Sequence, residues 1–208
     1  MDFKKEMNDE MKKVVKYDKP FIVTFSGLPE CGKTTIAREL SKDLGIYLLS
    51  NDYVRNYFYQ FTEDYNEEIR KNIERKVKKI NLCRLKKLLT TRTSFVYDRD
   101  FNTEQEYQIL DLIRRITYMD LIKIKVNSTD IENLERIKSR IMDYSKIYEG
   151  VIGDKVEYLS SYPEEVYYQI KDRKPQTLPD DFFDYVVNGD KFNIKMLEKK
   201  IRLDIKNK

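Results

Sequence analysis

The most constraining feature of this sequence is a glycine-bounded loop between a strand-like run and a helix-like run. Residues 21–25 read FIVTF, a short β-prone apolar run that is typical of a buried strand. Residues 34–44 then carry apolar side chains at helical spacing, and Gly45 follows as a helix terminator. The connecting residues 27–34 read GLPECGKT. A tight loop in this context lets consecutive backbone amides point at one anion.

The loop matches the P-loop pattern G-x-x-x-x-G-K-[ST] in the strand-to-helix context that the pattern requires. In such a loop the lysine, here Lys33, neutralises the β and γ phosphates of a nucleoside triphosphate, and the hydroxyl of Thr34 ligates Mg²⁺. We therefore predict that ATP and Mg²⁺ bind here. The predicted nucleotide-binding residues are Gly27, Leu28, Pro29, Glu30, Cys31, Gly32, Lys33, Thr34 and Thr35.

Composition narrows the class of protein. The chain has 208 residues, enough for one α/β domain, and 37% of them are charged. No apolar run approaches the roughly 18 residues of a membrane span, so we expect a soluble, cytoplasmic protein. The sequence contains no histidine, which excludes His-dependent triads and His-ligated zinc. Its two cysteines, Cys31 and Cys83, fit a reducing compartment.

Strand-like and helix-like runs alternate along the whole chain. Further strands are expected at 46–49, 95–97, 121–126 and 185–187, with helices between them, which favours an α/β fold whose parallel sheet is covered on both faces. Thr103, followed three residues later by Glu106, predicts a capping box at the start of a helix. Residues 3–16 read as an amphipathic helix, so we divide the chain into an N-terminal helix (1–19) packed on a P-loop domain (20–208).

Acidic residues close two of the predicted strands. In a parallel sheet, ligands bind beyond the carboxyl ends of the strands, so Asp52 is expected to face the γ-phosphate. Asp52 is a candidate to accept a proton from a phosphoryl acceptor, and Arg55, one helical turn on, is a candidate to hold an acceptor phosphate. Asp98 occupies the position of a metal-binding acid, and Arg99 and Asn102 lie in the same loop.

Two basic segments accompany these candidates. Arg136 and Arg140 project from a predicted helix that leads into an irregular segment, and we predict that residues 136–179 form a lid that excludes water and supplies positive charge. Between positions 70 and 92, ten basic residues stand against a single acid, Glu74. This block is either the solvated face of a helix or a surface that binds phosphate backbones.

Other P-loop classes fit less well. The base-reading string N-K-x-D and the switch string D-x-x-G of GTP switch proteins are both absent, and no motor-type ATPase features are evident. The carboxylates and cations described above are instead what phosphoryl transfer to a bound acceptor requires.

The successive segments GLPECGKT, LLSNDYVR, FVYDRDFN and ENLERIKSR resemble the P-loop kinase family that includes the kinase domain of phage polynucleotide 5′-hydroxyl kinase, and more distantly zeta toxins and small-molecule kinases. The resemblance covers residues 21 to about 190. It implies a five-stranded parallel sheet of order 2-3-1-4-5 with a helical lid. It also implies that Asp52 is the general base, that Arg55 orients the acceptor, and that Arg136 and Arg140 are lid arginines.

The acceptor stays open at this stage. A 5′-hydroxyl of a polynucleotide is favoured by the basic block and the many tyrosines, which can stack on bases. A nucleoside, nucleotide, sugar or amino sugar is the alternative, as is a nucleotide-binding module without turnover. The sequence does not indicate the oligomeric state.

Overall fold

A five-stranded parallel sheet forms the centre of the molecule. The computed structural model describes residues 3–28, 30–60, 67–136, 178–189 and 191–207. Its strands are β1 (Phe21–Ser26), β2 (Tyr47–Ser50), β3 (Phe95–Asp100), β4 (Asp120–Asn127) and β5 (Tyr185–Asn188). They are ordered β2-β3-β1-β4-β5, and every neighbouring pair is parallel. The predicted α/β fold and the 2-3-1-4-5 order are therefore confirmed.

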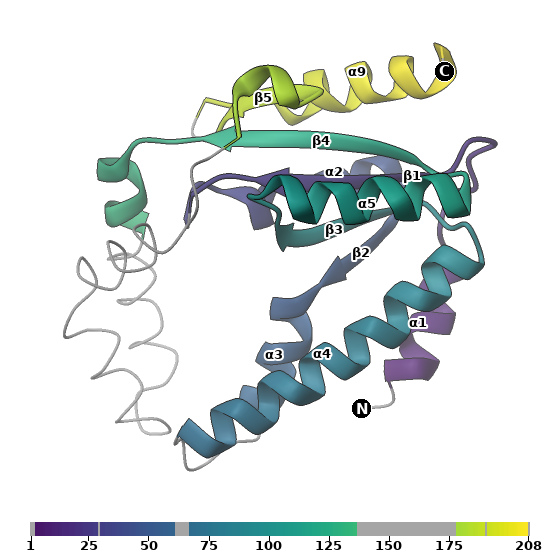
Figure 1. Ribbon diagram of the computed structural model, residues 1–208, viewed down its shortest axis with the longest axis vertical. Helices are drawn as coiled ribbons and strands as arrows, with labels where there is room; N and C mark the ends of the chain where they lie inside the picture. The colour runs from purple at the N-terminus through teal and green to yellow at the C-terminus, as the bar shows by residue number, and fades with distance from the viewer. Residues whose placement is uncertain (1–2, 29, 61–66, 137–177, 190, 208) are drawn as a thin grey trace.

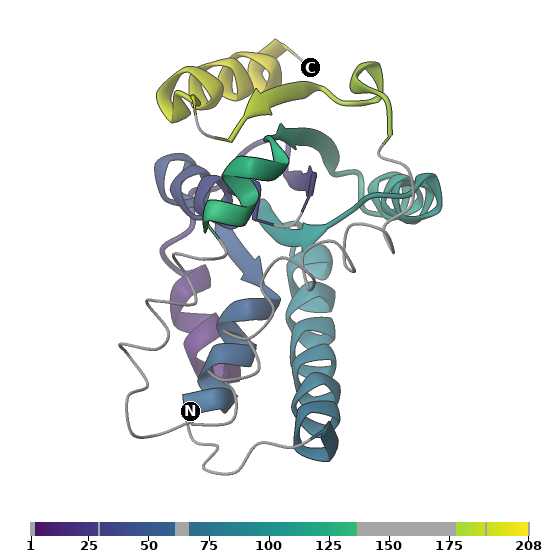
Figure 2. The ribbon, with the colours of Figure 1, turned by 90° about the vertical axis from the view of Figure 1, so that its left-hand side faces the viewer.

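Helices cover both faces of this sheet (Figures 1 and 2). The bounds are α1 (Phe3–Met11), α2 (Lys33–Leu44), α3 (Asn51–Gln60), α4 (Glu67–Thr90), α5 (Glu104–Thr117) and α9 (Ile194–Asn207), with a short 3₁₀ helix η1 (Asp180–Phe182) and a helical stretch at 130–136. Figure 2 shows α2 and α5 on opposite sides of the sheet. The predicted capping box closes the start of α5, where the Thr103 side chain accepts from the Glu106 amide.

The central strand β1 supplies both cores through its alternating side chains. Phe21, Val23 and Phe25 pack with α2 and α9, whereas Ile22 packs on the other face with β2, β3 and α5. Every residue of β1 is buried, as expected for a strand with helices on both sides.

Helices α3 and α4 form an arm beyond the sheet, with α1 beside α4 (Figure 1). Val54 of α3 packs against Ile73 and Val77 of α4. One member of the basic block, Arg84, is buried here, 4% exposed, and donates to the Tyr47 hydroxyl through Nε at 2.9 Å. Because α3 begins at the residue after the end of β2, its first turns lie beside the carboxyl end of that strand.

The N-terminal helix is shorter than the predicted 3–16. It ends at Met11, and the following residues bind the end of α2 instead: the Val15 amide donates to the Gly45 carbonyl at 2.8 Å, and the Tyr17 hydroxyl donates to the Leu44 carbonyl at 2.8 Å. A long-range contact has replaced the last helical turn.

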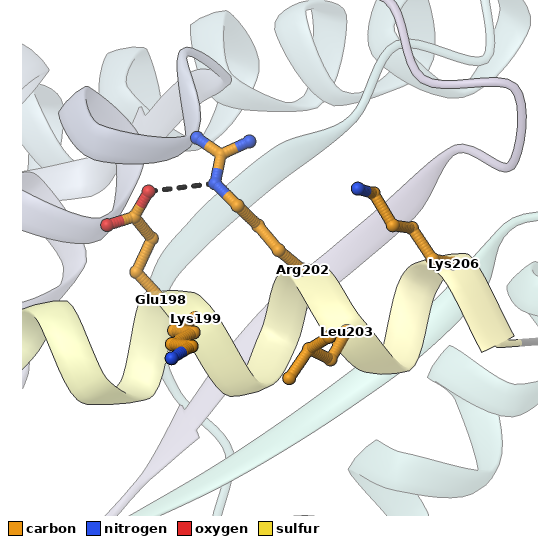
Figure 3. A pocket seen from close by; sticks show the side chains of 5 residues that line it. All are labelled: Glu198, Lys199, Arg202, Leu203 and Lys206. Carbon is orange, nitrogen blue, oxygen red and sulfur yellow. Dashed lines mark hydrogen bonds and ion pairs between the residues drawn. The ribbon is translucent and has the colours of Figure 1, made fainter.

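The C-terminal helix α9 is tied to the same place. Figure 3 shows a shallow hollow along its surface, lined by Glu198, Lys199, Arg202, Leu203 and Lys206. Arg202 pairs with Glu198 at 2.8 Å and also donates to the Asp43 carbonyl near the end of α2, at 2.7 Å. These contacts fix the end of α2 that is opposite to the P-loop.

Helix α2 carries the P-loop, so its packing holds that loop in place. We expect Leu40→Ala, at a position that is fully buried, to lower the free energy of unfolding by about 2–5 kcal/mol because it leaves a cavity. Leu82→Ala on α4 is the matched control, because Leu82 is 67% exposed, and it should change stability by less than about 0.5 kcal/mol. Urea unfolding measures both; equal losses would contradict this account of the core.

Candidate functional site

The P-loop leaves β1 through backbone conformations that favour glycine. Gly27 has φ 145° and Gly32 has φ 96°. A Cβ atom at Gly27 would lie 2.4 Å from the carbonyl oxygen of Val126, so a larger residue does not fit there. Glu30 has φ 62°, which is strained for a residue with a side chain. The loop is thus held in a tight turn.

Helix α2 begins immediately after this turn. Gly32 is its N-cap, no described side chain caps it, and its first turn contains no acid. A helix start of this kind presents its amides and the positive end of its dipole to an anion. The nucleotide-binding role of residues 27–35 stays a prediction, and one of these residues, Pro29, lies outside the described residues.

The Lys33 side chain contacts the backbone of the P-loop. Its ammonium donates to the Gly27 carbonyl at 3.1 Å, contacts the Cys31 sulfur at 3.4 Å and pairs with the Asp100 carboxylate at 3.1 Å. Burial acts to lower the pKa of Lys33, but Cys31 and Asp100 raise it, and the net pKa lies above the usual value of lysine. The cation is therefore present and held where phosphates would bind.

The two predicted metal ligands, Thr34 and Asp98, contact each other. The Thr34 hydroxyl donates to one oxygen of Asp98 at 3.1 Å, and the Ser50 hydroxyl donates to the other at 2.9 Å. Burial raises the pKa of Asp98 above its usual range; the hydrogen bond from Ser50 opposes this and the nearby Asp52 carboxylate adds to it. A hydroxyl and a carboxylate side by side are oxygen ligands that suit Mg²⁺.

Asn102 holds the start of the P-loop through hydrogen bonds. Its side-chain oxygen accepts from the Ser26 hydroxyl at 3.0 Å and from the Gly27 amide at 3.3 Å, and the residue is 7% exposed. Asn102 is thus directed at the start of the P-loop, whereas Arg99 pairs with Glu106 at 3.2 Å on the surface. This gives Asn102 a positioning role that the sequence alone did not suggest.

Asp52 and Arg55 lie in the first turns of α3 and contact each other. Arg55 is also bound by Glu74 of α4, with Nε at 2.6 Å from Oε1 and Nη2 at 3.3 Å from Oε2. The guanidinium is therefore shared by two carboxylates. Neighbouring Asn81 of α4 donates to the Ser50 carbonyl at 3.3 Å, which ties α4 to the end of β2.

Arg136 reaches the loop from the helical stretch 130–136. Its Nη1 donates to the Glu30 carbonyl at 2.6 Å. This contact places one predicted lid arginine at the rim of the phosphate site. Arg140 and nearly all of the predicted lid, 137–177, lie outside the described residues.

Four residues that contact this site were not predicted from the sequence: Asp100, Ser50, Glu74 and Asn81. The alternation Asp98-Arg99-Asp100 was a readable signal, because side chains two apart on a strand share a face. Glu74 was visible only as the single acid in a basic helix. Its partner, Arg55, is 19 residues away, so the pairing depends on how α3 packs against α4.

Comparison with known proteins gives a family match. The family described as AAA domain matches residues 23–159, which include the P-loop, Asp52 and Asp98. No curated protein matches the sequence.

Solved structures share the fold at low sequence identity. A proposed kinase of Chloroflexus aurantiacus has a TM-score of 0.62 at 16% identity, covering 89% of this chain and 98% of its own. Kti12 of Chaetomium thermophilum, in complex with ADP-AlF3, has 0.56 at 14%, covering 88% and 98%. The Mycobacterium tuberculosis APS kinase CysC, in complex with AMPPNP and APS, has 0.50 at 14%, covering 91% and 99%. In the described residues, no helix is long and apolar enough to cross a membrane.

Loss of the Asn102 support should affect both stability and nucleotide binding. We expect Asn102→Ala to cost about 1–3 kcal/mol of unfolding free energy, because it leaves a buried amide and a buried hydroxyl without their acceptor. Binding of an ATP analogue, measured by calorimetry, should weaken as well. Asn72→Ala on the exposed surface of α4 is the control. Unchanged analogue affinity in Asn102→Ala would show that Asn102 does not position the loop.

The raised pKa of Asp98 predicts a pH dependence of stability. The folded protein holds a proton on Asp98 above the unfolded pKa of about 3.9, so this group lowers the free energy of unfolding as the pH rises from about 4 toward the folded pKa. Asp98→Asn should therefore stabilise the nucleotide-free protein at pH 7, with a smaller gain near pH 4, as measured by urea unfolding.

Asp111→Asn is an opposite-sign control for this measurement. A hydrogen bond from Arg114 lowers the pKa of the half-buried Asp111, so its replacement should not stabilise the protein at pH 7. A less stable Asp98→Asn at pH 7 would contradict the assignment.

Proposed function

Since this chain belongs to the family described as AAA domain and carries a carboxylate-lined strand edge beside its P-loop, we propose that it is an ATP-dependent phosphotransferase. It moves the γ-phosphoryl group of ATP to an acceptor hydroxyl. The observation that carries this proposal is that Asp98 contacts Thr34, the residue after Lys33, and lies near Asp52, so that two candidate metal ligands and a candidate proton acceptor stand together beside the P-loop.

The loop amides and Lys33 would hold the triphosphate. Because Lys33 already lies between Asp100 and the loop carbonyls, nucleotide binding exchanges these contacts for phosphate oxygens. Thr34 and Asp98 are the residues that would hold Mg²⁺, which supplies neutralisation of phosphate charge when it is bound. Arg136, already on the Glu30 carbonyl, is in reach to add positive charge at the same rim.

Asp52 is the proposed proton acceptor. The acceptor O–H bond breaks as its proton passes to the Asp52 carboxylate, and a new O–P bond forms to the γ-phosphorus. The bond between that phosphorus and ADP breaks in the same transfer, so ADP leaves with the electron pair. Asp52 suits this role because its side chain is 52% exposed, which leaves it open to an approaching hydroxyl.

A polynucleotide 5′-hydroxyl is the first candidate acceptor. Most of the basic block on α4 is exposed, and α4 packs on α3, the helix that carries Asp52. Exposed cations along one helix suit a phosphate backbone. Lys71, Arg75, Lys76, Lys78 and Lys79 are such residues.

A small metabolite is the second candidate, and one observation favours it. Arg55, the residue expected to hold an acceptor phosphate, is already engaged by Asp52 and Glu74. An acceptor without a phosphate at that position would leave these pairs intact.

Labelled ATP tests the proposal and separates the acceptors. The protein is incubated with γ-labelled ATP and Mg²⁺ in three separate reactions. The acceptor is a 5′-hydroxyl oligonucleotide in the first, the same oligonucleotide with a 5′-phosphate in the second, and a panel of nucleosides, sugars and amino sugars in the third. We expect the label on an acceptor hydroxyl. Lys33→Ala should lower transfer by roughly 100- to 1,000-fold and Asp52→Asn by roughly 100- to 10,000-fold.

The two variants should differ in binding. Asp52→Asn should bind an ATP analogue as well as the wild type does, whereas Lys33→Ala should bind it more weakly. Asp9→Asn on α1 is the charge-removal control and should retain full activity. Tight ATP binding with no label on any acceptor would indicate a nucleotide-binding module instead.

A further inference from the structure

Glu74 of α4 forms an ion pair with Arg55 near the site, and the phosphoryl-transfer steps proposed above give it no role. Both of its carboxylate oxygens contact Arg55, through Nε at 2.6 Å and Nη2 at 3.3 Å. A two-point contact of this kind fixes the plane of the guanidinium as well as its position. Glu74 and Arg55 are 32% and 27% exposed, so the pair is partly shielded from water.

The same guanidinium makes its third contact with Asp52. Nη1 of Arg55 binds Oδ1 of Asp52, so the contact to Glu74 and the contact to Asp52 use different nitrogens. A carboxylate on the first turn of a helix can adopt several side-chain rotamers. Because Glu74 fixes the plane of the Arg55 guanidinium, the contact with Nη1 of Arg55 restricts the rotamers that Asp52 can adopt.

Packing between α3 and α4 holds Glu74, Arg55 and Asp52 in this arrangement. Val54, the residue before Arg55, is fully buried against Ile73 and Val77, which flank Glu74 on α4. Asn81, two turns further along α4, holds the Ser50 carbonyl and the Asn51 side chain directly before Asp52. The positions of Glu74 and Asp52 are therefore set by the same apolar contact between α3 and α4 and by the same carboxyl end of β2.

We propose that Glu74 is a positioning residue for the phosphoryl-transfer reaction, acting through Arg55 to hold the Asp52 carboxylate in the orientation that accepts the acceptor's proton. The inference rests on the proposed function. It assigns Arg55 to the support of Asp52, in place of the contact with an acceptor phosphate that the sequence suggested.

Kinetics of Glu74→Gln test this role. The amide keeps the shape of the side chain and removes its charge, so Arg55 is freed to turn fully onto Asp52. We expect kcat to fall about tenfold, with the KM for ATP within twofold of wild type, because the P-loop is untouched. Glu68→Gln removes a charge from an exposed position of the same helix and should leave kcat unchanged.

A double-mutant cycle distinguishes positioning from a separate structural effect. If Glu74 acts through Arg55, adding Glu74→Gln to Arg55→Gln should change kcat less than twofold. Losses that multiply, or a Glu74→Gln enzyme with wild-type kcat, would overturn the proposal. Urea unfolding of each variant shows whether a loss of activity reflects loss of folding.

Crystal structures of the wild type and Glu74→Gln keep the test independent of turnover. The expected result is an Asp52 side chain in the same rotamer in every wild-type copy and in a changed or mixed rotamer in the variant. Unchanged Asp52 and Arg55 side chains in the variant would overturn the inference even if the enzyme is active. If the wild type transfers phosphate to no acceptor but Asp52 moves as expected, the proposed function fails while the positioning by Glu74 stands.

Discussion

The site depends on an irregularity in the pairing of the two central strands. β1 and β3 run in register from Ile22 opposite Phe95 to Thr24 opposite Tyr97, but Phe25 then stands opposite Asp100. The Phe101 amide rejoins the ladder by donating to the Phe25 carbonyl at 3.0 Å. A bulge of this kind bends a strand and re-aims its side chains.

That bulge lets one short segment serve three parts of the P-loop. Asp98 accepts from Thr34, Asp100 pairs with Lys33, and Asn102 accepts from Gly27. Asp98 and Asp100, two apart on β3, share a face of the strand, and the bulge changes the position along β1 at which they stand. The loop, the helix after it and the end of β3 therefore form one unit, and the proposed ligands of ATP and Mg²⁺ come from its two sides.

The acidic side chains around the loop also have a cost. Burial beside Asp52 raises the pKa of Asp98, so the charged form is disfavoured in the nucleotide-free protein. A buried acid of this kind is typical of functional sites, where stability is given up for a group that the ligand later satisfies. The charged form of Lys33, in contrast, is favoured by its contacts with Asp100 and with the Gly27 carbonyl, which a triphosphate would replace.

Local patterns in the sequence determined the strands, most of the helices, the P-loop and the capping box at Thr103, because each depends on residues close together in the chain. They also placed Asp52 and Asp98 at strand ends, and parallel pairing then brought both to one edge. Only the tertiary structure decided that Arg84 is buried, that α1 ends early so that Val15 can bind Gly45, and that Asn102 faces the loop. Glu74 and Arg55 meet for the same reason: their contact is set by how two helices pack, and no spacing along the chain encodes that packing.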